Sequence, residues 1–169
     1  MPTVSATTIP AASLLRGLSE GADFKDAYDA PLADASLSPT QIFLAAARAA
    51  PAWAEALMSM RNRVVRLFGL KDVGALGAMA RTGPQDYEVG DRLGIFNVFA
   101  KTSDEIVLGI DDRHVDVRVS VMKTLGGESP RYAVSTVVNV HNLLGRLYML
   151  PVARIHPLIV RSMMGRAAT

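Results

Sequence analysis

The sequence predicts one α+β domain, in which a curved antiparallel sheet wraps a long C-terminal helix and two helices precede the main strands. Hydrophobic residues follow helical spacing over residues 38–70, alternate with polar residues over 88–141, and return to helical spacing over 142–166. The connections between the alternating segments are short, which favours an antiparallel meander. Half of the 169 residues are hydrophobic, so one domain can bury a sizeable core.

The first 70 residues predict a small N-terminal unit and a helix pair. Residues 1–37 are expected to hold a short helix from Pro10 to Leu18 and a strand from Ala22 to Leu32. Ser38 is then followed by proline at the first helical position and glutamine at the third, the pattern of a capping box. A helix is expected from there to Ala49.

A second helix is expected from Pro51 to Gly69, with the glycine as its C-cap. Its apolar positions recur at intervals of three and four residues and predict one buried face, whereas Glu55, Ser59, Asn62 and Arg66 share the other side. The expected buried face consists of Trp53, Leu57, Met60, Val64, Leu67 and Phe68. Residues 71–87 are rich in glycine and predict a loop.

Four strands and the terminal helix complete the expected fold. The strands are predicted at Glu88–Ala100, Glu105–Ile110, Arg113–Lys123 and Tyr132–His141. The helix is predicted from Leu143 to Arg166, with arginines at 146, 154 and 161 on its outer side. Its expected core side consists of Leu144, Leu147, Tyr148, Ile155, Leu158, Ile159 and Met163.

Composition excludes several kinds of site. The chain has no cysteine, so disulfides and thiolate chemistry are ruled out. The three histidines are scattered, so neither a metal site nor a cofactor is expected. The first residues lack the pattern of a signal peptide, and charged residues and prolines interrupt the apolar stretch at 143–160. We therefore expect a cytoplasmic protein with no transmembrane segment.

The formal net charge of +2 conceals an uneven distribution, because segments of opposite sign alternate along the chain. Residues 129–169 carry arginines and no acidic side chain. These charges either pair across the fold or form a basic face for anions or lipid head groups. Only 6% of the residues are aromatic, so a nucleic-acid partner is not expected.

Several short motifs occur in a specific order. They are Ala22–Phe24, Gly90–Gly94, Asp111–Ser120, His141–Tyr148 and His156–Arg161. With them the chain resembles the bacterial family catalogued as domain of unknown function 2867, which is similar to the helix-grip superfamily of polyketide cyclases and lipid-transfer domains. The resemblance implies an apolar pocket between the sheet and the C-terminal helix. Related domains follow NAD(P)-binding domains in longer chains, and no glycine-rich dinucleotide turn is present here.

The strand expected at 113–123 carries the first group of candidate ligand-binding residues. A two-residue period puts His114, Asp116, Arg118 and Ser120 on one face and four valines on the other. The polar face can orient a ligand carbonyl or phosphate. In the alternative interpretation, the valines pack inward and the polar row is solvated.

His141 and Asn142 form the second group, where the last strand passes into the terminal helix. Asn142 is a natural N-cap for that helix. His141 shares a strand face with Ser135 and Asn139, so a second polar row can border a cavity between sheet and helix.

Three hypotheses of function follow. The first is a domain that binds a small apolar or amphipathic ligand, with polar contacts from His114, Asp116, Arg118, His141 and Asn142. The second is an enzyme of the cyclase, isomerase or hydratase kind, with His114 or His141 as general base and Arg118 as oxyanion partner. The third is an interaction module that forms a homodimer or docks on a dehydrogenase-like partner through the basic terminal helix.

Overall fold

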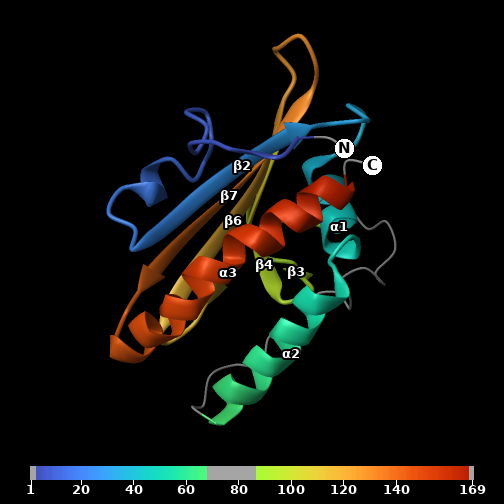
Figure 1. Cartoon of the computed structure of the whole chain (residues 1–169). Coiled ribbons are helices and arrows are strands. Elements are labelled where there is room, and N and C mark those ends of the chain that lie inside the picture. Colours follow the sequence, from blue (N-terminus) through green and yellow to red (C-terminus); the bar gives the residue numbers. More distant parts are fainter. Residues whose placement is uncertain (1–2, 68–86, 168–169) are drawn as a thin grey trace.

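The computed structural model describes residues 3–67 and 87–167 and confirms the α+β class. The element order is β1 (Ser5–Ala6), a 3-10 turn (Gly17–Ser19), β2 (Phe24–Pro31), α1 (Pro39–Arg48), α2 (Ala52–Leu67), β3 (Arg92–Leu93), β4 (Phe96–Lys101), β5 (Glu105–Asp111), β6 (Val115–Thr124), β7 (Arg131–Val140) and α3 (Leu143–Ala167). Figure 1 shows α3 crossing one face of the sheet, with α1 beside its C-terminal end and α2 extending away from the sheet.

The strands form one seven-stranded antiparallel sheet in the order β1-β2-β7-β6-β5-β4-β3. The predicted meander is confirmed from β4 to β7, and the early strand β2 pairs with β7. The strand expected at 88–100 is instead divided into β3 and β4. Leu93 pairs with Phe96, and Gly94 turns the chain between them with a φ of 63°, a conformation that favours glycine.

The helix-covered face of the sheet carries the apolar side of β6. Val115 and Val117 pack with Met149 of α3, while Val119 and Val121 belong to a larger core that includes Met164 near the end of α3. The valines therefore point towards α3, so the polar residues between them on β6 point to the opposite face.

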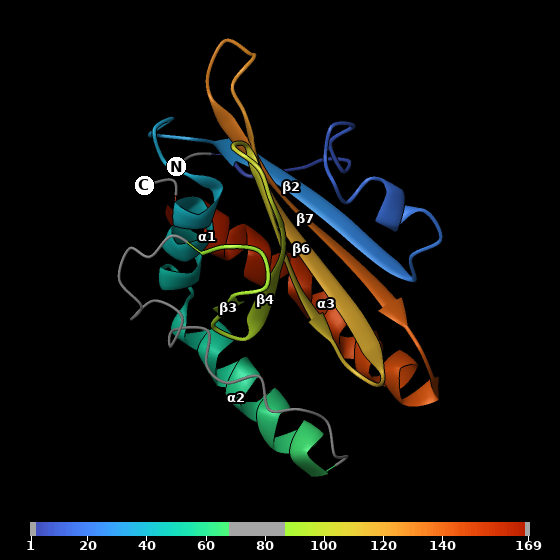
Figure 2. The same ribbon diagram turned by 180° about the vertical axis from the view of Figure 1, so that it is seen from behind.

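The opposite face of the sheet is covered by the N-terminal segment (Figure 2). Ile9 and Leu15 pack there against Val107 and Val137. The buried Glu105 carboxylate accepts hydrogen bonds from the hydroxyls of Ser13, at 2.6 Å, and Ser120, and from the amide of Leu14 at 2.9 Å. A polar side chain at this depth is tolerated because several hydrogen-bond donors satisfy its oxygen atoms.

The helix predicted from Pro10 to Leu18 is wrong, because this segment consists of turns with 3-10 geometry only at Gly17–Ser19. Ser13 and Leu14 direct donors to Glu105, a residue far along the chain. These hydrogen bonds to Glu105 hold the segment in turns. The local sequence pattern does not reveal a partner so distant in the chain.

The first two helices begin where the sequence predicted. The capping box is confirmed, since the Gln41 amide donates to the Ser38 hydroxyl at 3.2 Å and the Ser38 amide donates to the Gln41 side chain at 2.8 Å. In α2 the predicted faces are wrong at two positions, because Trp53 is 42% exposed and Asn62 is buried. The side chains of Met60, Val64 and Leu67, with Phe68, Gly69 and the segment up to residue 86 for which a loop was predicted, lie outside the described residues.

The terminal helix is confirmed, but part of its predicted core side is wrong. Leu147 and Leu158 are 55% and 60% exposed, and the buried residues of α3 are Gly145, Met149 and Met164. Apolar residues occur all round this helix, so their spacing does not identify the side that meets the sheet.

Candidate functional site

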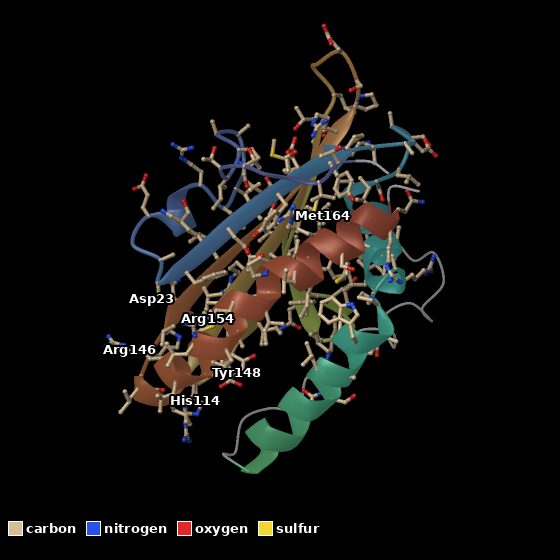
Figure 3. The ribbon with its side chains drawn as sticks, in the orientation of Figure 1. Asp23, His114, Arg146, Tyr148, Arg154 and Met164 are labelled. Atoms are coloured by element: carbon tan, nitrogen blue, oxygen red, sulfur yellow. The ribbon has the colours of Figure 1, made fainter. Side chains whose placement is uncertain are left out.

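The β6–α3 junction brings His114 and Asn142 together. The His114 ring is buried, and its Nδ1 lies 3.0 Å from the Asn142 Oδ1. The same oxygen accepts the Gly145 amide at 3.0 Å, which confirms Asn142 as the N-cap of α3. Because an amide oxygen only accepts, His114 Nδ1 carries the proton and donates. The hydrogen bonds of both side chains therefore join the start of β6 to the start of α3. Figure 3 shows His114 at this end of the helix and Met164 at the other end.

The other predicted site residues lie on the sheet face away from α3. His141 Nε2 lies 3.0 Å from Asp116 Oδ2, and both side chains are partly exposed. Arg118 pairs with Asp111 at 2.7 Å and lies 3.8 Å above the ring of Phe99. The structure thus brings His141 to Asp116 and His114 to Asn142, while Arg118 contacts neither histidine. Ser135, expected to border a sheet–helix cavity with His141, is buried on this same far face.

A different polar cluster lies between the sheet and α3. Asp26 on β2 pairs in register with Thr136 on β7, so their side chains share the helix-covered face. His156 of α3 contacts Asp26, with Nδ1 3.0 Å from Asp26 Oδ2. The His156 and Phe24 rings also pack edge to face, with centroids 5.8 Å apart. We call Asp26, Thr136 and His156 the sub-helix cluster.

Two oxygen atoms of the sub-helix cluster are buried without a hydrogen-bond partner among the described residues. They are Asp26 Oδ1 and Thr136 Oγ1. Thr136 is 2% exposed and the Asp26 side chain is 12% exposed. Buried polar atoms nearly always have a partner, because an unsatisfied one costs about 1–3 kcal/mol. The two atoms occupy paired positions of neighbouring strands, β2 and β7.

The neighbours of the sub-helix cluster on the sheet are Tyr28 of β2 and two valines of β6. Burial raises the pKa of the Tyr28 hydroxyl, the charge of Asp26 raises it further, Arg161 lowers it, and hydrogen bonding of the hydroxyl to the Asp26 side chain adds to the rise. On the sheet, Thr136 pairs with Val119, and Val119 and Val117 are only half-buried. Two half-buried valines, which pack against the core clusters, therefore lie near Thr136 on the same face of the sheet.

A separate recess of about 60 Å³ lies at the far end of α3, between α1 and the end of β2. Its lining includes Leu37, Ile42, Tyr132 and Ala167. Sites for organic ligands usually enclose about 300–1,000 Å³, so this recess is too small for one.

Sequence reasoning missed the sub-helix cluster, although both of its ionisable residues lay in or beside noticed motifs. His156 begins the last motif, and Asp26 follows Ala22–Phe24 by two residues. The signal available was a histidine within a strongly apolar helix. Asp23 itself has a structural role, because its carboxylate accepts the Val140 amide at 2.7 Å and ties β2 to the end of β7.

The cluster does not have the composition of a metal centre. Among the described residues, no three histidine or acidic side chains lie close enough together to hold a metal ion. Asp26 and His156 supply two potential ligands and Thr136 a neutral hydroxyl. The chemistry that these groups offer is hydrogen bonding and proton exchange.

Comparison with known proteins identifies the family. A family model described as protein of unknown function (DUF2867) matches residues 18–163, which include β2, β7 and most of α3 and therefore the whole sub-helix cluster. Comparison with the curated proteins and with the solved structures gave no match. Because the matched region spans most of the sequence, the chain belongs to the DUF2867 family of proteins of unknown function.

Proposed function

We propose that the protein binds a small, mainly apolar molecule between the sheet and α3, anchored by Asp26, Thr136 and His156. The observation that carries the proposal is the pair of buried oxygen atoms, Asp26 Oδ1 and Thr136 Oγ1, that have no partner among the described residues. A site of this kind, apolar with a few convergent polar groups, is the usual form of a ligand site.

The two oxygen atoms define the chemistry of the ligand's polar end. An ionised carboxylate only accepts hydrogen bonds, whereas a threonine hydroxyl donates one and accepts others. A ligand hydroxyl or amide N–H would satisfy Asp26 as a donor. The rest of the ligand would lie over Val117 and Val119, which are half-buried on the helix-covered face. The ligand is therefore an amphipathic molecule with a hydrogen-bond donor at one end.

The polar contacts proposed here replace those expected from His114, Asp116, Arg118, His141 and Asn142. Asn142 holds His114, Asp116 pairs with His141, and Asp111 and Phe99 engage Arg118. Support for an enzyme that combines His114 or His141 with Arg118 is weak for the same reason.

An isomerase- or cyclase-like activity is the second candidate, favoured by the hydrogen bond between His156 and Asp26. An aspartate at Nδ1 fixes the tautomer, so Nε2 becomes the hydrogen-bond acceptor of the neutral ring. His156 would then take a proton from a ligand held by Thr136. This activity requires the binding site proposed above.

A series of probes tests the binding proposal. Primary alcohols and primary amides with alkyl chains of increasing length are compared with methyl ethers of the same length, by thermal shift and native mass spectrometry. The alcohols and amides should raise the Tm, and the ethers, which lack a donor, should raise it much less. Asp26→Asn and Thr136→Val should weaken the effect, and Arg118→Ala, on the other face of the sheet, should leave it unchanged. Equal responses in all four proteins would overturn the proposed site.

A further inference from the structure

The outer side of α3 has an unusual composition for an exposed surface. At about 100° per residue, an arc of about 80° on this helix contains four leucines and two arginines. They are Leu143, Leu147, Leu150, Arg154, Leu158 and Arg161. We call this set the outer arc.

The leucines of the outer arc are among the most exposed large hydrophobic residues described. Leu143 is 72% exposed, Leu150 is 58% exposed, and Leu147 and Leu158 are similar. Single exposed leucines are normal on protein surfaces, but a row along one helix marks an interaction site. In Figure 1 no other described element lies over this side of α3.

The charge on α3 has one sign only. The helix contains four arginines and neither aspartate nor glutamate. Arg146, Arg154 and Arg161 are exposed and form no ion pair with the described carboxylates. A helix surface that combines leucines with arginines and lacks acidic residues is complementary to a surface that is apolar below and anionic above.

We propose that the outer arc of α3 is a docking surface for an anionic lipid membrane. The leucines would enter the boundary between head groups and acyl chains, and the arginines would extend to the lipid phosphates. A second copy of the chain fits less well, because it would bring arginines against arginines without acidic partners. The outer arc belongs to α3 alone, and docking there does not require the ligand proposed above.

The helix would lie in the plane of the membrane surface. Among the described residues, α3 is long and apolar enough to cross a membrane by length and composition, which is weak evidence by itself. Met149 and Met164 hold the two halves of α3 on the sheet. A helix fixed along a folded domain in this way presents one side to lipid and does not span the bilayer.

Vesicle co-sedimentation of the full chain tests the proposal. The vesicles are phosphatidylcholine alone or a mixture with phosphatidylglycerol, each at low and at high salt. Binding is expected to the mixed vesicles and to weaken as salt screens the charges. Arg154→Gln with Arg161→Gln should reduce partitioning roughly 25-fold, at about fivefold for each basic residue near an anionic surface.

Two further variants separate apolar from charge contributions and control for folding. Leu147→Gln with Leu150→Gln should reduce partitioning at least roughly tenfold, because less apolar area enters the lipid. Arg16→Gln with Arg92→Gln removes the same charge from exposed positions outside α3 and should bind like the parent. Unchanged melting curves would show that each variant is folded.

Several results would overturn the proposal. They are equal binding to neutral and anionic vesicles, no binding to either, or equal losses in the α3 arginine variant and the Arg16–Arg92 control. The oligomeric state, measured by sedimentation velocity, gives one further test. If the parent is a dimer and Leu147→Gln with Leu150→Gln converts it to a monomer, the outer arc binds a second copy of the chain and the proposal is overturned.

Discussion

Replacing Thr136 by valine should stabilise the protein. The side chain is 2% exposed, and its hydroxyl has no hydrogen-bond partner among the described residues. Valine keeps the shape and the β-branching, so strand preference and packing change little. Removing an unsatisfied buried hydroxyl should raise the free energy of unfolding by about 1–3 kcal/mol. In a domain of this size each kcal/mol corresponds to a rise in Tm of roughly 2–4 °C.

Urea unfolding followed by circular dichroism measures this change directly, with thermal melts as a second readout. Val138→Thr is the matched control, because Val138 is 4% exposed and occupies the next position on the same face of β7. It adds a hydroxyl where valine now packs, and should lower the free energy of unfolding by a similar amount. If Thr136→Val instead lowers the stability by 1 kcal/mol or more, the hydroxyl has a partner in the folded protein and the reasoning fails.

Three further predictions concern the two ends of α3. Burial raises the pKa of Tyr132 from its ordinary value of 10.0 to about 12, so the folded state keeps this proton after the unfolded state has lost it. The free energy of unfolding should therefore fall between pH 10 and 12, by up to about 1.4 kcal/mol per pH unit, and urea titrations should show a shallower fall for Tyr132→Phe. Asn142→Ala removes the cap of α3 and leaves the buried His114 Nδ1 without its acceptor, which should cost about 2–4 kcal/mol in urea unfolding; a loss below 0.5 kcal/mol would contradict the junction described. Gly145→Ala places a Cβ 2.3 Å from the His114 carbonyl oxygen, and calorimetry should show a loss of about 1–3 kcal/mol, whereas an unchanged Tm would mean that the two backbones are not in close contact.

The sequence predicted those parts of the fold that depend on local signals. The capping box at Ser38 positions α1, and the alternation of β6 indicated a strand with one face of valines. Asn142 was predicted as an N-cap from its place between a strand and a helix, and its hydrogen bond to the Gly145 amide confirms this. In each case the stabilising group lies within a few residues of the structure that it determines.

Features that depend on distant partners were not predictable in the same way. The N-terminal segment folds as turns because Glu105, about 90 residues later in the chain, accepts its donors. The facing of β6 follows from which surface α3 covers, and periodicity identifies two faces without saying which is buried. The predicted site residues were polar and close together in sequence, so their pattern indicated a site that the tertiary structure divides among separate contacts.

The sub-helix cluster shows the same limit in a functional feature. Asp26, Thr136 and His156 come from three elements that are widely separated in the sequence. The pairing of β2 with β7 makes Asp26 a neighbour of Thr136, and the path of α3 brings His156 to Asp26. None of these approaches follows from spacing within one segment.

Methyl NMR of the full chain during titration with a primary alcohol tests the ligand site most directly. If the alcohol binds at the sub-helix cluster, the largest shift changes should occur at the methyl groups of Thr136, Val117 and Val119, and Val107 and Val137 on the other face should change little. Shift changes that centre on Val107 and Val137, or none at saturating alcohol, would contradict the proposed ligand site.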